Sequence, residues 1–110
     1  MINVSNYDED SDSLIISARE DNERVKTNFV LGDFIISLTG GGKVVSLEIR
    51  EFSNFLKEYG IDFKRVEKEM GNLTLIVKPK KEMLFIGVGL NNQAIKQIPV
   101  ANIPLPCIKN

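Results

Sequence analysis

The stretch Tyr7-Asp8-Glu9-Asp10-Ser11-Asp12-Ser13-Leu14-Ile15-Ile16 sets a carboxylate-rich loop directly against a compact run of branched apolar residues. Branched residues bounded by acidic turn residues are typical of a β-strand, so we predict a strand over Leu14 to Ala18. The same stretch therefore indicates that a small, mainly β domain begins here.

The pattern of short strands continues to residue 49. Residues 25–29 alternate apolar and polar side chains, which is the period of a strand with one face in water. The segments Phe34 to Leu38 and Val44 to Ile49 flank a glycine-rich loop at residues 39–43, and this arrangement predicts a β-hairpin. One face of the resulting sheet should be apolar.

The apolar period then changes to that of a helix. Phe52, Phe55, Leu56 and Tyr59 fall at i, i+3, i+4 and i+7, and they predict a helix that Ser53 can cap. Gly60 should end it. A second short helix is expected from Asp62, whose carboxylate can accept the free N–H groups at its start, and Gly71-Asn72 should terminate that helix.

The C-terminal third predicts strands again. Leu73 to Lys78 and Met83 to Gly89 should form a second hairpin around the turn Pro79-Lys80-Lys81-Glu82, and Ala94 to Val100 should add a strand. Prolines at 99, 104 and 106 remove backbone donors, so residues 103–108 are expected at a sheet edge or as an extended arm.

These segments predict an α+β fold: an antiparallel sheet of about six strands, with one helical segment of two short helices in the middle of the chain. The length of 110 residues fits a single domain. Within it we expect a β-hairpin unit at 1–50, a helical segment at 52–70, a second hairpin unit at 73–100 and an extended tail at 101–110.

The first half resembles a known family. Tyr7-Asp8-x-x-x-Asp12-Ser13-Leu14-Ile15-Ile16, Gly42-Lys43-Val44-Val45-Ser46-Leu47-Glu48-Ile49 and Phe52-Ser53 look like the domain-of-unknown-function 2283 family, over roughly residues 7–55. Ser46 replaces the usual small glycine. The resemblance implies a β-β-β-α unit and, since some relatives sit beside small toxin-like ribonucleases, an antitoxin-like role.

Composition sets the class of protein. The core must come from Ile, Leu and Val, because the chain has no Trp and few aromatic residues, and such a small core favours a homodimer. No apolar run approaches the ~20 residues of a membrane span, and no export signal begins the chain, so we expect a soluble cytoplasmic protein. Cys107 is the single cysteine, which agrees with a reducing compartment.

The chain contains no histidine, which argues against an enzyme. Without an imidazole there is no Ser-His-Asp or Cys-His pair, and zinc, copper and nickel lack their preferred ligands. We expect no cofactor. Gly40-Gly41-Gly42-Lys43 suggests a phosphate loop, but Val44 and a strand follow it where Ser or Thr and a helix are required. We interpret it as a hairpin tip.

The carboxylate oxygens of the chain could bind a hard cation. Asp8, Asp10 and Asp12 have the spacing of a calcium loop, but Ser13 and Arg19 stand where that loop needs glycine and glutamate. A looser divalent-metal site from Asp8, Asp12 and Glu48 is an alternative to a solvated turn. A carboxylate-based enzyme using these acids and Tyr7 is a further one.

Charge is unevenly distributed along the chain. Residues 1–23 hold seven Asp and Glu against Arg19 alone, and the remainder is mildly basic. A basic cluster could hold nucleic acid, but no stacking aromatic residues are interleaved with it, so we do not expect that partner. The cluster consists of Lys57, Lys64, Arg65, Lys68, Lys78, Lys80 and Lys81.

These observations favour a small non-enzymatic protein, a homodimeric protein–protein interaction module. The first alternative is an antitoxin-like or nucleic-acid-associated regulator, and the second is the divalent-metal-binding protein or carboxylate enzyme described above. Exposed strand edges and the proline-rich tail support the leading interpretation.

Overall fold

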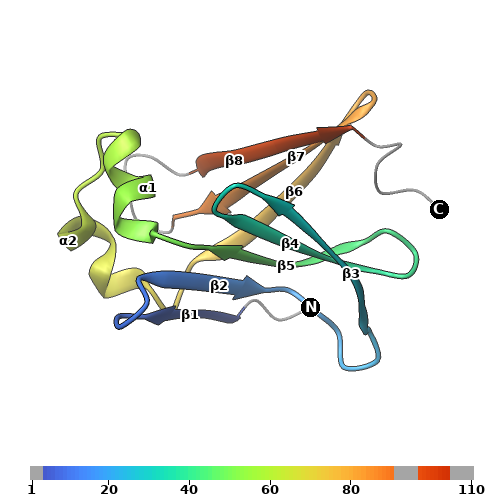
Figure 1. The fold of residues 1–110 in the computed structure, drawn as a ribbon, viewed down its shortest axis with the longest axis horizontal. Helices are drawn as coiled ribbons and strands as arrows, with labels where there is room; N and C mark the ends of the chain where they lie inside the picture. The colour runs from blue at the N-terminus through green and yellow to red at the C-terminus, as the bar shows by residue number, and fades with distance from the viewer. Residues whose placement is uncertain (1–3, 91–96, 105–110) are drawn as a thin grey trace.

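The computed structural model describes residues 4–90 and 97–104, which alternate short strands with one helical segment (Figure 1). The elements in chain order are β1 (Val4–Asp8), β2 (Ser13–Ser17), β3 (Val25–Leu31), β4 (Phe34–Thr39), β5 (Val44–Ile49), α1 (Phe52–Glu58), α2 (Phe63–Val66), the 3₁₀-helix η1 (Glu67–Glu69), β6 (Thr74–Lys80), β7 (Met83–Gly89) and β8 (Gln97–Pro104).

The strands form two antiparallel sheets. Five strands lie in the order β1-β2-β5-β4-β3, and three lie in the order β6-β7-β8. The α+β prediction is confirmed, but the expected number of strands is wrong, because the described residues form eight strands in two sheets. β1 was not predicted, since its sequence VSNYD is mostly polar. Backbone pairing with β2 makes this polar segment a strand.

The core lies between the two sheets and is closed at one end by the helices. In the five-stranded sheet Ile16, Leu47 and Ile36 occupy paired positions on the inner face, and all three are fully buried. The three-stranded sheet contributes buried aliphatic side chains from β7 and β8. The core members from the second sheet and the helices are Leu84, Ile86, Val88, Ile98, Ile103, Phe52, Phe55, Leu56 and Val66.

Both helices lie together at one end of the molecule, and the β6–β7 turn lies at the other (Figure 1). Three members of the predicted helical stripe, Phe52, Phe55 and Leu56, are buried, whereas the fourth, Tyr59, is 43% exposed. The ring of Phe55 meets Phe34 of β4 edge-on, with 5.6 Å between ring centroids. No helix among the described residues is long and apolar enough to cross a membrane.

Both predicted hairpins are confirmed, with a shorter second turn than expected. β4 pairs with β5 and β6 pairs with β7. The predicted turn began at Pro79, but Pro79 and Lys80 belong to β6, and Lys81 turns the chain with a φ of 54°. An edge strand tolerates Pro79, because the outer side of β6 has no ladder partner to lose.

β8 forms an edge of the three-stranded sheet and includes residues 101–104, which were predicted to belong to the extended tail. Pro99 stands opposite Gly87, where the register between β7 and β8 shifts, and such irregular positions accept a proline. Ile103 is buried and belongs to this strand. The predicted residues 94–96 and 105–108, including Cys107, lie outside the described residues.

Candidate functional site

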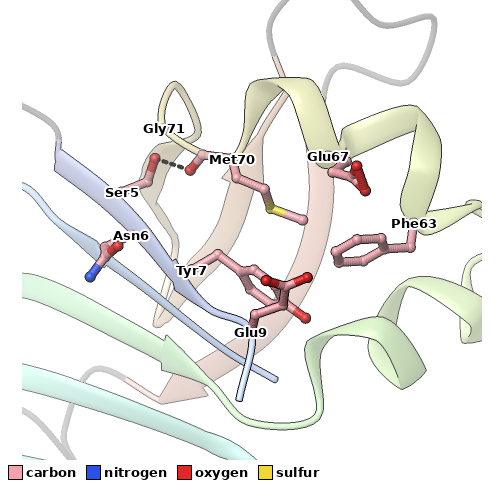
Figure 2. A pocket seen from close by; sticks show the side chains of 8 residues that line it. All are labelled: Ser5, Asn6, Tyr7, Glu9, Phe63, Glu67, Met70 and Gly71. Carbon is pink, nitrogen blue, oxygen red and sulfur yellow. Dashed lines mark hydrogen bonds between the residues drawn. The ribbon is translucent and has the colours of Figure 1, made fainter. Parts of the chain in front are cut away.

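A pocket of about 430 Å³ lies between β1 and the segment formed by α2 and η1 (Figure 2). It brings residues 5–9 beside residues 63–71, which are far apart in the sequence. The lining residues are Ser5, Asn6, Tyr7, Glu9, Phe63, Glu67, Met70 and Gly71.

Hydrogen bonds of Ser5 connect the two walls of the pocket. Ser5 is only 9% exposed, and its Oγ donates a hydrogen bond to the Met70 carbonyl oxygen at 2.6 Å. The same Oγ accepts a hydrogen bond from the Leu73 N–H at 3.1 Å. A buried hydroxyl whose donor and acceptor functions are both used is held in one orientation, so β1 and residues 70–73 keep a fixed spacing.

Tyr7 and Phe63 form an aromatic corner of the pocket. Their ring centroids are 5.3 Å apart with an angle of 52° between the ring planes. The Tyr7 ring also lies 6.0 Å from that of Phe52 in α1. Tilted pairs of this kind are favourable and hold both rings in place. The pocket therefore has a rigid apolar surface next to its polar rim.

The Tyr7 hydroxyl points out of the pocket toward the start of α1. It donates a hydrogen bond to Oδ1 of Asp12 at 2.6 Å. The Asp12 carboxylate also accepts the Ser53 hydroxyl at 2.6 Å and the Ser53 N–H at 3.1 and 3.2 Å. Burial, the hydrogen bond to Asp12 and the charge of Asp12 raise the pKa of Tyr7 to about 12.

Asp12 caps α1 from a distant part of the chain. Glu51 precedes the helix with a φ of 52° and provides no side-chain cap, while the Phe52 N–H donates to the Asp12 carbonyl oxygen at 2.9 Å. The prediction that Ser53 caps the helix is therefore wrong. Burial tends to raise the pKa of the Asp12 carboxyl, but hydrogen bonds from Ser53 and Tyr7 outweigh it and lower that pKa below 3.8.

The second helix follows its prediction more closely. Asp62 precedes α2, and its side chain accepts a hydrogen bond from the Lys64 N–H at 3.2 Å. This cap sets the start of the helix so that Phe63 and Glu67, four positions apart, fall on the same side and both line the pocket.

The rim of the pocket is acidic. Glu9 and Glu67 come from opposite walls, and both are exposed (Figure 2). Among the described residues the lining contains no Lys or Arg. Within residues 4–90 and 97–104 neither carboxylate has an ion-pair or hydrogen-bond partner. Two carboxylates without a direct partner in this part of the chain therefore line the pocket beside the aromatic corner.

The structure places the three predicted metal ligands in different environments. Asp8 is exposed and accepts the Asp10 N–H at 3.0 Å, as expected of a turn in which the aspartate bonds its own backbone. Asp12 caps α1. Glu48 lies opposite Ile15 and Ile35 on the outer face of the five-stranded sheet. No group of three or more possible metal ligands is found in the described part of the chain.

The structure also shows where the glycine-rich loop and the residues of the predicted basic cluster lie. Lys43 forms an ion pair with Glu23 at 2.7 Å, so its charge is partnered at the hairpin tip. The predicted basic cluster is divided between the two ends of the molecule (Figure 1). Residues 57–68 contribute their cations at the helical end, while residues 78–81 contribute theirs at the β6–β7 turn, where Lys80 lies 5.2 Å from the centre of the Phe85 ring.

Comparison of the chain with protein-family models, with curated proteins and with solved structures gave no match. The pocket itself was not predicted, although one signal was present. Phe63, Glu67 and Met70 recur at i, i+4 and i+7, and Ser5 and Tyr7 alternate as strand residues do. Only the packing of α2 and η1 against β1 brings the two patterns together.

Proposed function

We propose that this protein is a non-enzymatic interaction module that forms a homodimer by pairing β3 with β3 of a second copy. The observation that carries the proposal is the free outer edge of β3. Among the described strands it pairs with β4 alone, and it ends the five-stranded sheet. On an edge strand every second residue turns its N–H and C=O away from the sheet, where another strand can bind them.

The four sheet edges differ in how well they can accept a further strand. β8 contains Pro99 and Pro104, and β6 contains Pro79, so each lacks backbone donors. β1 has only five residues and runs into the acidic turn. β3 has seven residues and no proline, which makes it the most suitable edge among the described strands.

The side chains of β3 support the same conclusion. Val30 is 59% exposed and Val25 is 42% exposed, so β3 carries two exposed branched apolar residues. Phe29 and Leu31 pack only partly against the core. A second β3 running antiparallel would cover these residues in both copies, because a two-fold interface uses the same surface twice.

The test is the concentration dependence of the molecular mass in sedimentation velocity, for the wild type and the Val30→Lys variant. We expect a dimer for the wild type and a monomer for the variant, because an exposed lysine on an edge strand opposes strand addition. Val30 is exposed, so the variant should fold, and circular dichroism checks this.

Val4→Lys is the matched control. Val4 is 57% exposed and lies on β1, the opposite edge of the same sheet. This variant should remain dimeric. A monomeric wild type, or a dimer that survives Val30→Lys, would contradict pairing through β3.

A further inference from the structure

We propose that the pocket between β1 and the α2–η1 segment binds a monovalent organic cation, a guanidinium or alkylammonium group. This inference does not depend on the dimer. β1 and β3 are opposite edges of the five-stranded sheet, so a ligand in the pocket and a second copy on β3 occupy separate surfaces.

The charge of the pocket lining determines the sign of the charge on the ligand. Glu9 and Glu67 stand on opposite walls, and no basic side chain of residues 4–90 or 97–104 lines the space between them. An anion would meet two carboxylates without a counter-charge. A cation would gain attraction from both, and a partly enclosed site screens this attraction less than open solvent does.

The aromatic corner determines that the cation is organic. Calcium takes six to eight oxygen ligands, and magnesium requires octahedral oxygen geometry, whereas Tyr7, Phe63 and Met70 contribute two aromatic rings and a thioether to the lining (Figure 2). Ring faces attract guanidinium and ammonium groups when the charge lies within about 6 Å of the ring centre. The aliphatic part of such a ligand can also pack on the Met70 side chain.

Contacts within the chain hold the walls of the site in place. The Tyr7 ring is held by its hydroxyl bond to Asp12 and by its contacts with two other rings. Ser5 fixes the distance between the walls. A volume of about 430 Å³ accommodates one amino-acid side chain or a small amine, and little ordering is needed on binding.

The experiment titrates the full chain with N-acetyl-argininamide at constant ionic strength and follows the backbone amides by ¹H–¹⁵N correlation spectra. We expect saturable shifts concentrated at Tyr7, Phe63 and Gly71. N-acetyl-citrullinamide has nearly the same shape without the charge, and it should cause no such shifts. Equal binding of the neutral compound, or the absence of saturable shifts with the charged one, would overturn the proposal.

Three variants test whether the cation binds in this pocket. Glu67→Gln removes one exposed charge, and Phe63→Leu removes one ring while leaving an apolar side chain. Loss of the ring should weaken binding about two- to fivefold, which corresponds to the ~0.5–1 kcal/mol of an exposed cation–π contact. Glu48→Gln removes a carboxylate from the outer sheet face and should leave the affinity unchanged. Unchanged affinity in both pocket variants would contradict the site.

The two sources of such a cation are separated with a short Gly-Ser peptide that contains one arginine. A higher affinity for the peptide than for the amide supports recognition of a basic side chain on a protein. Equal affinity supports a free small cation. Saturable binding of calcium, magnesium or manganese at the same amides in place of the arginine derivative would overturn the assignment to an organic cation.

Discussion

Asp12 binds Ser53 across 41 positions of sequence, through hydrogen bonds from both the Ser53 hydroxyl and its backbone N–H. The β1–β2 turn thereby caps α1, and the same carboxylate holds the Tyr7 hydroxyl. One side chain thus joins the first sheet, the helix and the aromatic wall of the pocket. The acidic loop supplies a structural link as well as surface charge.

Replacing Asp12 with alanine should destabilise the protein by about 1–2 kcal/mol, because a helix cap is lost and Tyr7 loses its hydrogen-bond partner. Urea denaturation would measure this difference. Asp10→Ala is the matched control, since Asp10 lies in the same turn and is exposed. An equal effect of both substitutions would show that loop charge, and not the link to Ser53, determines stability.

Stability should fall in acid in a way that depends on Asp12. The folded-state pKa of this carboxyl is lowered below 3.8, so its contribution is present above that value and is lost as the pH falls through the folded pKa. Comparing wild type with Asp12→Asn by denaturation at several pH values would measure the effect. The difference in unfolding free energy should shrink as the solution becomes more acidic, and a constant difference would contradict the assignment.

Tyr7 should ionise near pH 12. The pKa of Tyr7 is raised from 10.0 in the folded state. The stability that this shift contributes is fully present below pH 10 and is lost as the pH rises toward 12. The chain has two tyrosines, and the Tyr59→Phe variant leaves Tyr7 as the only one whose tyrosinate absorbance can change. Adding Asp12→Asn to that variant should move the midpoint down, because it removes the carboxylate charge. An unmoved midpoint would show that Asp12 does not raise the pKa.

Gly87→Ala should destabilise the protein by about 1–3 kcal/mol, the usual cost of overpacking. A Cβ at Gly87 would lie 2.9 Å from the Ile98 carbonyl oxygen of β8, and a backbone atom cannot easily move away. Gly71→Ala is the control, because a Cβ there meets no atom within 4 Å. Thermal melting of both variants measures the difference. Similar melting temperatures would show that β8 does not pack so closely on β7.

Gly87 and Gly89 alternate along one strand, a pattern that favours close approach of another backbone or a bulge. Both features occur at Gly87, because the backbone of Ile98 lies close to it and the register of the β7–β8 pair shifts there. The hairpins, the helical stripe and the cap by Asp62 were likewise predicted from neighbouring residues. Each depends on local periodicity or turn chemistry, which a short stretch of sequence contains in full.

The sequence by itself determined the kinds of element, their order and the apolar faces that form the core, because those depend on residues a few positions apart. Tertiary structure alone decided the division into two sheets, the cap from Asp12 to Ser53 and the pocket beside Phe63. Each of these features joins residues about forty or more positions apart, or depends on which strands become neighbours. Burial of the whole core selects such pairings, and no local pattern contains that information.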